Sequence, residues 1–267
     1  MSLSAVTNCE AIWIETPQGR LFARRWFAGD TDSTKPVIVL LHDSLGCVEL
    51  WREFPQLLCQ ATGLDVVAWD RLGFGQSDSY PGTLPLTFIE DEAERFFPLL
   101  RAALGIGRFI AFGHSVGGAM ASACASRHGA DCVALITESA QAFVEDRTLE
   151  GIRIAKAQFD APGQLDRLRR YHADKAQWVL DAWTQTWLSP AFSDWTLERS
   201  VGPLHCPVLA LHGDLDEYGS VLHPARIAAL AGDAGTALIL EGCHHVPHRE
   251  DAARVLDKVC AYLRDLG

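Results

Sequence analysis

The sequence predicts an α/β protein with a mostly parallel, doubly wound central sheet of about eight strands. Three observations support this fold class. Short apolar runs recur along the chain, and segments with helical spacing or glycine-rich turns separate them. The runs are apolar throughout, as expected for strands that helices cover on both faces. One stretch, 141–203, has helical spacing without any strand-like run, so we expect a helical insertion before the seventh strand.

The first strands differ from the others. Segment 11–27 predicts two strands around a Pro-Gln-Gly turn, which gives the sheet an antiparallel start. The further predicted strands are 36–42, 64–70, 108–114, 132–138, 206–213 and 236–242.

Helical patterns lie between these strands. Small residues dominate 117–129, so that helix can pack closely on the sheet, and the last nineteen or so residues show the i, i+3, i+4, i+7 spacing of one buried face. We therefore divide the chain into a first core part at 1–140, a helical cap at 141–203 and a second core part at 204–267.

Composition excludes several classes of partner. The chain has 267 residues, 48% of them hydrophobic, and a formal net charge of −11. Such a surface repels phosphate backbones and anionic membranes, so we expect neither nucleic acid nor a membrane as partner, but a small-molecule substrate. The eight cysteines form no CxxC pair, and no basic leader or long apolar run is evident. These features favour a cytoplasmic protein.

One motif carries candidate chemistry. Gly113-His114-Ser115-Val116-Gly117 follows a predicted strand and opens the small-residue helix. A serine on such a sharp turn has its hydroxyl exposed, and glycines on either side avoid a steric collision. The helix behind it points backbone N–H groups at developing negative charge. This context predicts that Ser115 is a nucleophile.

A serine hydroxyl needs a base and an orienting acid, and in this architecture both follow the serine along the chain. Asp214 and Asp216 come after the strand at 206–213. His244, His245 and His248 come after the strand at 236–242. Because parallel strands end together, both groups should emerge on the same edge of the sheet as the serine.

The chain resembles the α/β-hydrolase superfamily of serine hydrolases over nearly all of its length outside 141–203, where family members carry a helical cap. The segments that carry the resemblance, in family order, are VLLHDSLGCVELWREF, WDRLGFGQSD, GHSVGG, LHGDLDEYG and GCHHVPHRED.

The resemblance implies roles for single residues. It places the nucleophile on Ser115, the base on His245 and the acid on Asp216, with Asp214 as the alternative acid. It also implies that the backbone amides of Val116 and Ser44 form an oxyanion hole.

Two positions depart from the family pattern. His244 and Asp43 stand where relatives usually have glycine. The first departure bears on the backbone of the histidine loop. The second puts a carboxylate beside the amide of Ser44.

Other polar residues have simpler interpretations. We expect no metal site among the clustered histidines, because Pro247 disfavours a helix that would bring His244 and His248 together. The G-x-G of 73–75 lacks a third glycine, so we expect neither NAD nor any other cofactor. Lone histidines elsewhere are taken as surface or loop residues.

The insertion holds half of the eight tryptophans, which either pack it on the core or line an apolar pocket. Our candidate pocket residues are His114, Trp183 and Trp187, although for His114 we favour a structural position that points into the core. The expected function is a cofactor-independent, carboxylesterase-like serine hydrolase that cleaves a small, largely apolar ester or related acyl substrate. The alternatives are a C–C bond hydrolase of the meta-cleavage-product type and, from another class, a receptor-like α/β hydrolase that binds a ligand with little turnover.

Overall fold

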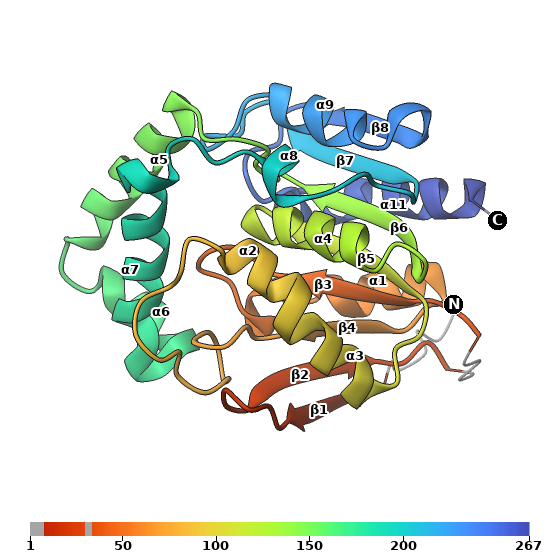
Figure 1. Cartoon of the computed structure of the whole chain (residues 1–267), viewed down its shortest axis with the longest axis horizontal. Helices are drawn as coiled ribbons and strands as arrows, with labels where there is room; N and C mark the ends of the chain where they lie inside the picture. Colours follow the sequence, from red (N-terminus) through yellow and green to blue (C-terminus); the bar gives the residue numbers. More distant parts are fainter. Residues whose placement is uncertain (1–7, 30–33, 267) are drawn as a thin grey trace.

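The computed structural model describes residues 8–29 and 34–266, and an eight-stranded sheet runs through its centre (Figure 1). The strands are β1 (Cys9–Ile14), β2 (Leu21–Trp26), β3 (Val37–Leu41), β4 (Val66–Trp69), β5 (Phe109–His114), β6 (Cys132–Glu138), β7 (Val208–Gly213) and β8 (Gly235–Leu240). Their spatial order is β1-β2-β4-β3-β5-β6-β7-β8. Strand β2 runs antiparallel to β1 and β4, and the other neighbouring pairs are parallel. The expected fold class is confirmed.

Helices and single turns connect the strands. The α-helices are α1 (Phe54–Thr62), α2 (Phe88–Asp91), α3 (Phe97–Leu104), α4 (Val116–Arg127), α5 (Asp146–Phe159), α6 (Gln164–His172), α7 (Ala176–Trp187), α8 (Leu197–Ser200), α9 (Leu222–Ala229), α10 (Pro247–Glu250) and α11 (Ala252–Asp265). The shorter elements are η1 (Val48–Trp51), the π-helix η2 (Glu92–Phe96), η3 (Ala173–Lys175), η4 (Pro190–Phe192) and η5 (Gly232–Ala234). None of the helices in the described part of the chain has both the length and the apolarity that a membrane crossing needs.

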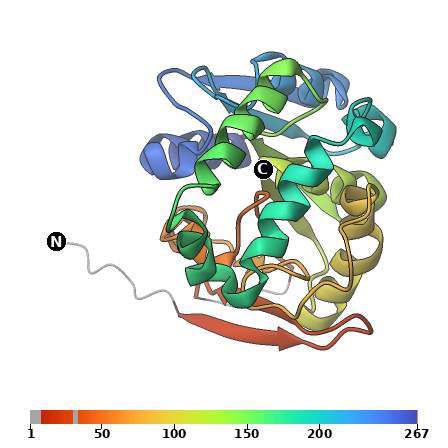
Figure 2. The same ribbon diagram turned by 90° about the vertical axis from the view of Figure 1, so that its left-hand side faces the viewer.

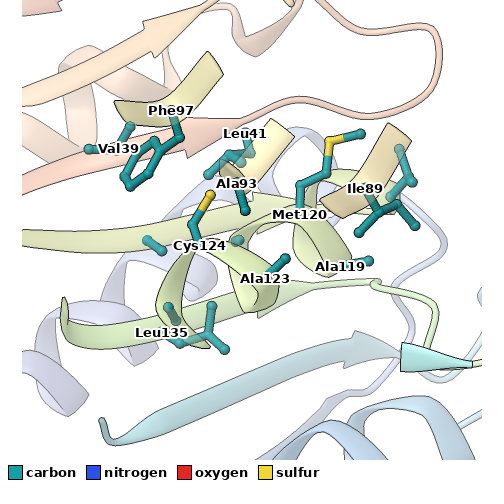
Figure 3. Close-up of a cluster of buried hydrophobic side chains, with 14 of the residues drawn as sticks. Val39, Leu41, Ile89, Ala93, Phe97, Ala119, Met120, Ala123, Cys124 and Leu135 are labelled. Carbon is teal, nitrogen blue, oxygen red and sulfur yellow. The ribbon is translucent and has the colours of Figure 1, made fainter. Parts of the chain in front are cut away.

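Side chains of the central strands point alternately to two cores. On β3, Val39 and Leu41 belong to one cluster with α2, α3 and α4, whereas Ile38 and Leu40 belong to another with α1 and α11. Figure 3 shows the first cluster, in which the small side chains of α4 lie among β3, β6 and the helices α2 and α3. Both faces of the strand are covered, which explains why its sequence is apolar at every position.

The helical insertion at 141–203 contains α5, α6, α7 and α8 and stands between β6 and β7. Helices α5, α6 and α7 gather at one end of the sheet, and Figure 2 shows them facing the viewer across that end. The first and last parts of the insertion pair with each other, through a bridge between Phe143 and Thr196. The insertion therefore enters and leaves the core at neighbouring points.

Candidate active site

Ser115 lies on the turn between β5 and α4 with a φ of 55° and a ψ of −127°. A residue other than glycine rarely has a positive φ, and the backbone of this turn needs close neighbours without side chains. A Cβ on Gly113 would stand 2.0 Å from the carbonyl oxygen of Gly117, and one on Gly117 would stand 2.1 Å from that of Leu41. The two glycines of the motif thus allow the turn that exposes the serine hydroxyl.

Three side chains form a continuous chain of hydrogen bonds. The Oγ of Ser115 lies 3.0 Å from Nε2 of His245, and Nδ1 of the same ring lies 2.9 Å from both carboxylate oxygens of Asp216. With Nδ1 protonated, the ring donates to the carboxylate and its Nε2 accepts from the serine hydroxyl. The residues come from the ends of β5, β8 and β7, so the edge expected from the parallel strands is where they meet.

The carboxylate of Asp216 is buried and well supplied with donors. Its Oδ1 accepts from the backbone N–H of Tyr218 at 2.8 Å and of Gly219 at 3.2 Å. Burial by itself would raise the pKa of Asp216, but the charge and hydrogen bond of His245 bring that pKa below its ordinary value. Asp214 lies elsewhere, exposed, and accepts from the N–H of Gly242 at 2.6 Å.

The other two clustered histidines point in different directions. His244 is exposed, and its ring lies 3.3 Å from Glu250 at the surface. It is not among the described non-glycine residues with positive φ, so the loop takes a histidine at this position without that strain. His248 is buried and bonds to Glu138. Pro247 begins α10 at a position where a backbone N–H would have no partner within the helix, so His244 lies outside that helix and does not share it with His248.

The two amides expected to form the oxyanion hole come from two different segments of the chain. Val116 is the first residue of α4, and Ser44 follows β3 and lines the cavity. Within the described residues, neither backbone N–H donates to a protein acceptor, whereas the N–H of Leu45 is occupied by Oδ1 of Asp43 at 2.8 Å. Both amides are thus free to receive a ligand oxygen.

A cavity of about 250 Å³ opens at this site. Ser115 and His245 line it from the core, and Thr148 and Ile152 of α5 line it from the insertion. Two of the expected pocket residues, Trp183 and Trp187 of α7, also line it. The cavity is mainly apolar and fits a small molecule.

The third expected pocket residue, His114, is not among the residues that line this cavity. It is 2% exposed and lies beneath the site, where Nε2 bonds to the carbonyl oxygen of His245 at 2.8 Å and Nδ1 lies 3.3 Å from Oδ2 of Asp43. Because both ring nitrogens already face acceptors, the ring stays in the interior. The expectation is corrected on this point.

Gln141 is a site residue that the sequence analysis missed. It follows β6, is 3% exposed, lines the cavity and brings Oε1 within 3.4 Å of the Ser115 Oγ. The only signal that could have found it is its place just after a central strand, at the edge where the other site residues emerge.

The family model described as the alpha/beta hydrolase fold matches residues 36–180, more than half of the chain and including the turn at Ser115. The chain belongs to the α/β hydrolase fold family.

Solved structures similar to this α/β hydrolase agree with that fold. A proline iminopeptidase from Mycobacterium smegmatis is 18% identical with a TM-score of 0.73, and the match covers 96% of this chain and 98% of that one. A thermophilic esterase from Thermogutta terrifontis is 18% identical with a TM-score of 0.68, over 96% and 99%. A serine hydrolase involved in carbazole degradation is 18% identical with a TM-score of 0.72, over 96% and 99%.

Three lone histidines of this α/β hydrolase are buried, contrary to the expected surface or loop positions: His172, His212 and His223. His172, from the insertion, accepts from the N–H of Gly75 and lies 3.0 Å from the carbonyl oxygen of Leu45, to which it donates. Burial lowers its pKa to about 4, so the ring is neutral and can both accept and donate. It ties the insertion to the loop that carries Ser44.

One group of buried side chains could offer ligand atoms to a cation. An atom each of His114, Glu138 and His248 lies within 4.8 Å of the others. In the structure these groups bind each other and their neighbours, and both nitrogens of His114 face acceptors. A nitrogen that carries a proton has no lone pair for a metal, so we assign no metal to this group.

Replacing each aspartate with asparagine separates the two candidate acids. With p-nitrophenyl butyrate as substrate, we expect Asp216→Asn to lower kcat by about 10⁴-fold, since an amide does not hold the required ring tautomer. We expect the kcat of Asp214→Asn to stay within about threefold of the wild-type value, because the amide oxygen can still accept from the N–H of Gly242. A larger loss in Asp214→Asn than in Asp216→Asn would move the acid to Asp214.

Proposed function

We propose that this α/β hydrolase is a cofactor-independent serine hydrolase that cleaves a small, uncharged, largely apolar ester through an acyl-enzyme. The observation that carries the proposal is the chain of hydrogen bonds from Ser115 through His245 to Asp216, at 3.0 and 2.9 Å. These distances fall within the reach that proton transfer from a hydroxyl requires.

The arrangement supports a two-step reaction. His245 accepts the hydroxyl proton at Nε2 while the Ser115 oxygen bonds to the ester carbonyl carbon, and the proton then goes to the departing alcohol. Water next loses a proton to the same nitrogen while its oxygen bonds to the acyl carbon. The bond between that carbon and the Ser115 oxygen then breaks, the proton returns from Nε2 to the serine, and the acid is released. Asp216 holds the ring and stabilises its charged form, and the Val116 and Ser44 amides bind the oxyanion of each tetrahedral intermediate.

We propose that the segment 141–203 is a cap over this reaction and that 1–140 and 204–267 form the core around it. Side chains of its helices α5 and α7 support this, because Thr148, Ile152, Trp183 and Trp187 all line the cavity that contains Ser115. Such a cover excludes water from the acyl pocket and favours an apolar acyl group of modest size.

Charge around the cavity favours a substrate without a carboxylate. Glu217 lines it, and no lysine or arginine is among its described lining residues. We therefore expect kcat/KM for p-nitrophenyl butyrate to exceed that for the mono-p-nitrophenyl ester of succinic acid, a substrate of similar length, by about tenfold or more. Glu217→Gln should narrow that ratio, and a preference for the succinate ester would refute this assignment.

The same lining bears on the alternative of C–C bond hydrolysis. A diketone acid, which has a carboxylate beside the diketone unit, would find no lysine or arginine among the described lining residues of this cavity. A panel of acyl esters of increasing chain length, run beside such a diketone acid, tests both activities on one preparation. We expect turnover of the short esters only. Faster cleavage of the diketone acid would reverse the order of the two candidates.

Labelling tests the nucleophile independently of any substrate. A fluorophosphonate probe should attach to the intact protein once per chain, and peptide mapping should locate the label on Ser115. Absence of both labelling and ester turnover in folded protein would favour the receptor-like alternative.

A further inference from the structure

The side chain of Asp43 lines the cavity from the loop that follows β3. Its Oδ1 accepts from the N–H of Leu45 at 2.8 Å, and its Oδ2 lies 3.3 Å from Nδ1 of His114. The side chain is 25% exposed and, like the adjacent Ser44, lines the cavity. A carboxylate is therefore held next to one of the two amides that we assign to the oxyanion hole.

His114 lies beneath the cavity and contacts the loop that carries His245. The ring bonds through Nε2 to the carbonyl oxygen of His245 at 2.8 Å, and its centroid is 5.2 Å from that of the His245 ring. Nε2 carries a hydrogen toward the carbonyl oxygen of His245, and Nδ1 lies within ion-pair distance of the Asp43 carboxylate. A second hydrogen on Nδ1 makes the ring an imidazolium, which is the form that pairs with that carboxylate.

The surroundings agree with that charge. Burial would lower the pKa of His114, but the hydrogen bond and charge of Asp43, with the charge of Glu138 on β6, raise it above its ordinary value. Burial likewise opposes ionisation of Asp43, and His114 holds the pKa of that carboxyl well below its ordinary value. The other charged or titratable groups that interact with the pair are His42, Cys47, Arg71, His172, Tyr218, His248 and Arg249.

We propose that Asp43 and His114 form an internal ion pair that positions the backbone of His245 and neutralises the carboxylate beside the oxyanion hole. The pair connects the loop after β3, the serine turn and the histidine loop, and it rests on the proposed function of Ser115 and His245. An unpaired carboxylate at the position of Asp43 would repel the oxyanion that forms during ester cleavage. Both are positioning residues, because they act on the amides and the base and not on the ester bond.

A double-mutant cycle tests the electrostatic part of the proposal. We expect His114→Gln to lower kcat for p-nitrophenyl butyrate by about 100-fold with KM within about threefold, because glutamine removes the described ion-pair partner of the Asp43 carboxylate. Asp43→Asn alone should lower kcat by about fivefold or less. The kcat of the double variant should be at least about tenfold higher than that of His114→Gln, since the second substitution removes the unpaired charge.

A merely structural role of His114 predicts no such recovery, so a double variant no faster than His114→Gln overturns the proposal. The matched control is the surface ion pair Arg127–Glu94, at 2.8 Å. The kcat of its single and double glutamine variants should stay within about twofold of the wild-type value. If wild-type protein neither hydrolyses the ester nor labels at Ser115, the proposed function fails. If wild type does both and recovery is absent, only the ion pair fails.

A spectroscopic measurement keeps the proposal testable if His114→Gln does not fold. Heteronuclear NMR of the ring nitrogens should show His114 titrating at a higher pH in the wild type than in Asp43→Asn, by about one pH unit. An equal or lower midpoint in the wild type would show that Asp43 does not hold the charge of His114.

Discussion

Replacement of Ser115 with alanine is expected to lower kcat for p-nitrophenyl butyrate by about 10⁵-fold or more, because the residues of such a triad act as a unit. The remaining rate should stay above that of the uncatalysed reaction, since the substitution leaves in place the Val116 and Ser44 amides that we propose as the oxyanion hole. The change removes one oxygen at a residue that is 7% exposed, so thermal unfolding should shift little.

The control for this substitution is a change at Gln141, a polar residue next to Ser115 in the same cavity. Gln141→Ala alters a side chain 3.4 Å from the Ser115 Oγ but leaves the hydrogen bond to His245 in place. Fluorophosphonate should still label Gln141→Ala and fail to label Ser115→Ala. An unchanged rate in folded Ser115→Ala would contradict the proposed nucleophile.

The second large effect concerns the base. We expect His245→Ala to lower kcat by about 10⁵-fold, because no other described imidazole lies within hydrogen-bond distance of the Ser115 Oγ. The kcat of His244→Ala should remain within about tenfold of the wild-type value. That substitution removes an exposed pair with Glu250, whereas the backbone N–H of residue 244 can still donate to the same carboxylate at 2.7 Å.

Kinetics of both variants on one substrate, with circular dichroism to establish folding, measure this difference. The reverse ranking would shift the assignment of the base by one residue along the loop. Equal and small losses would instead argue against a histidine base in this cavity.

Much of the fold could be read from the sequence because it depends on local patterns. Every expected strand has its counterpart within a few residues, since an apolar run between two turns specifies a strand wherever both faces are covered. The serine turn was equally readable, because Gly113 and Gly117 meet a steric requirement of the backbone around them. For the same reason, the ends of β5, β7 and β8 predicted the edge at which the candidate site forms.

Side-chain partners were less predictable, because they depend on residues far apart in the chain. His172 was expected at the surface, but it lies buried between Gly75 and Leu45, about a hundred positions away. His114 was expected in the pocket and lies beneath it, since its neighbours Asp43 and His245 arrive from two other loops. No spacing within the motif around Ser115 carries information on such contacts.

The sequence by itself determined the order of the strands along the chain, the helical insertion between the sixth and seventh, and the turn that exposes Ser115. These follow from periodicity and glycine sterics, which act between near neighbours. Only the tertiary structure decided that Asp216 and not Asp214 faces His245, that the three clustered histidines have three different carboxylate partners, and that Asp43 lies against His114. Those outcomes depend on which loops the packed sheet brings together at one edge, and that packing is a property of the whole chain.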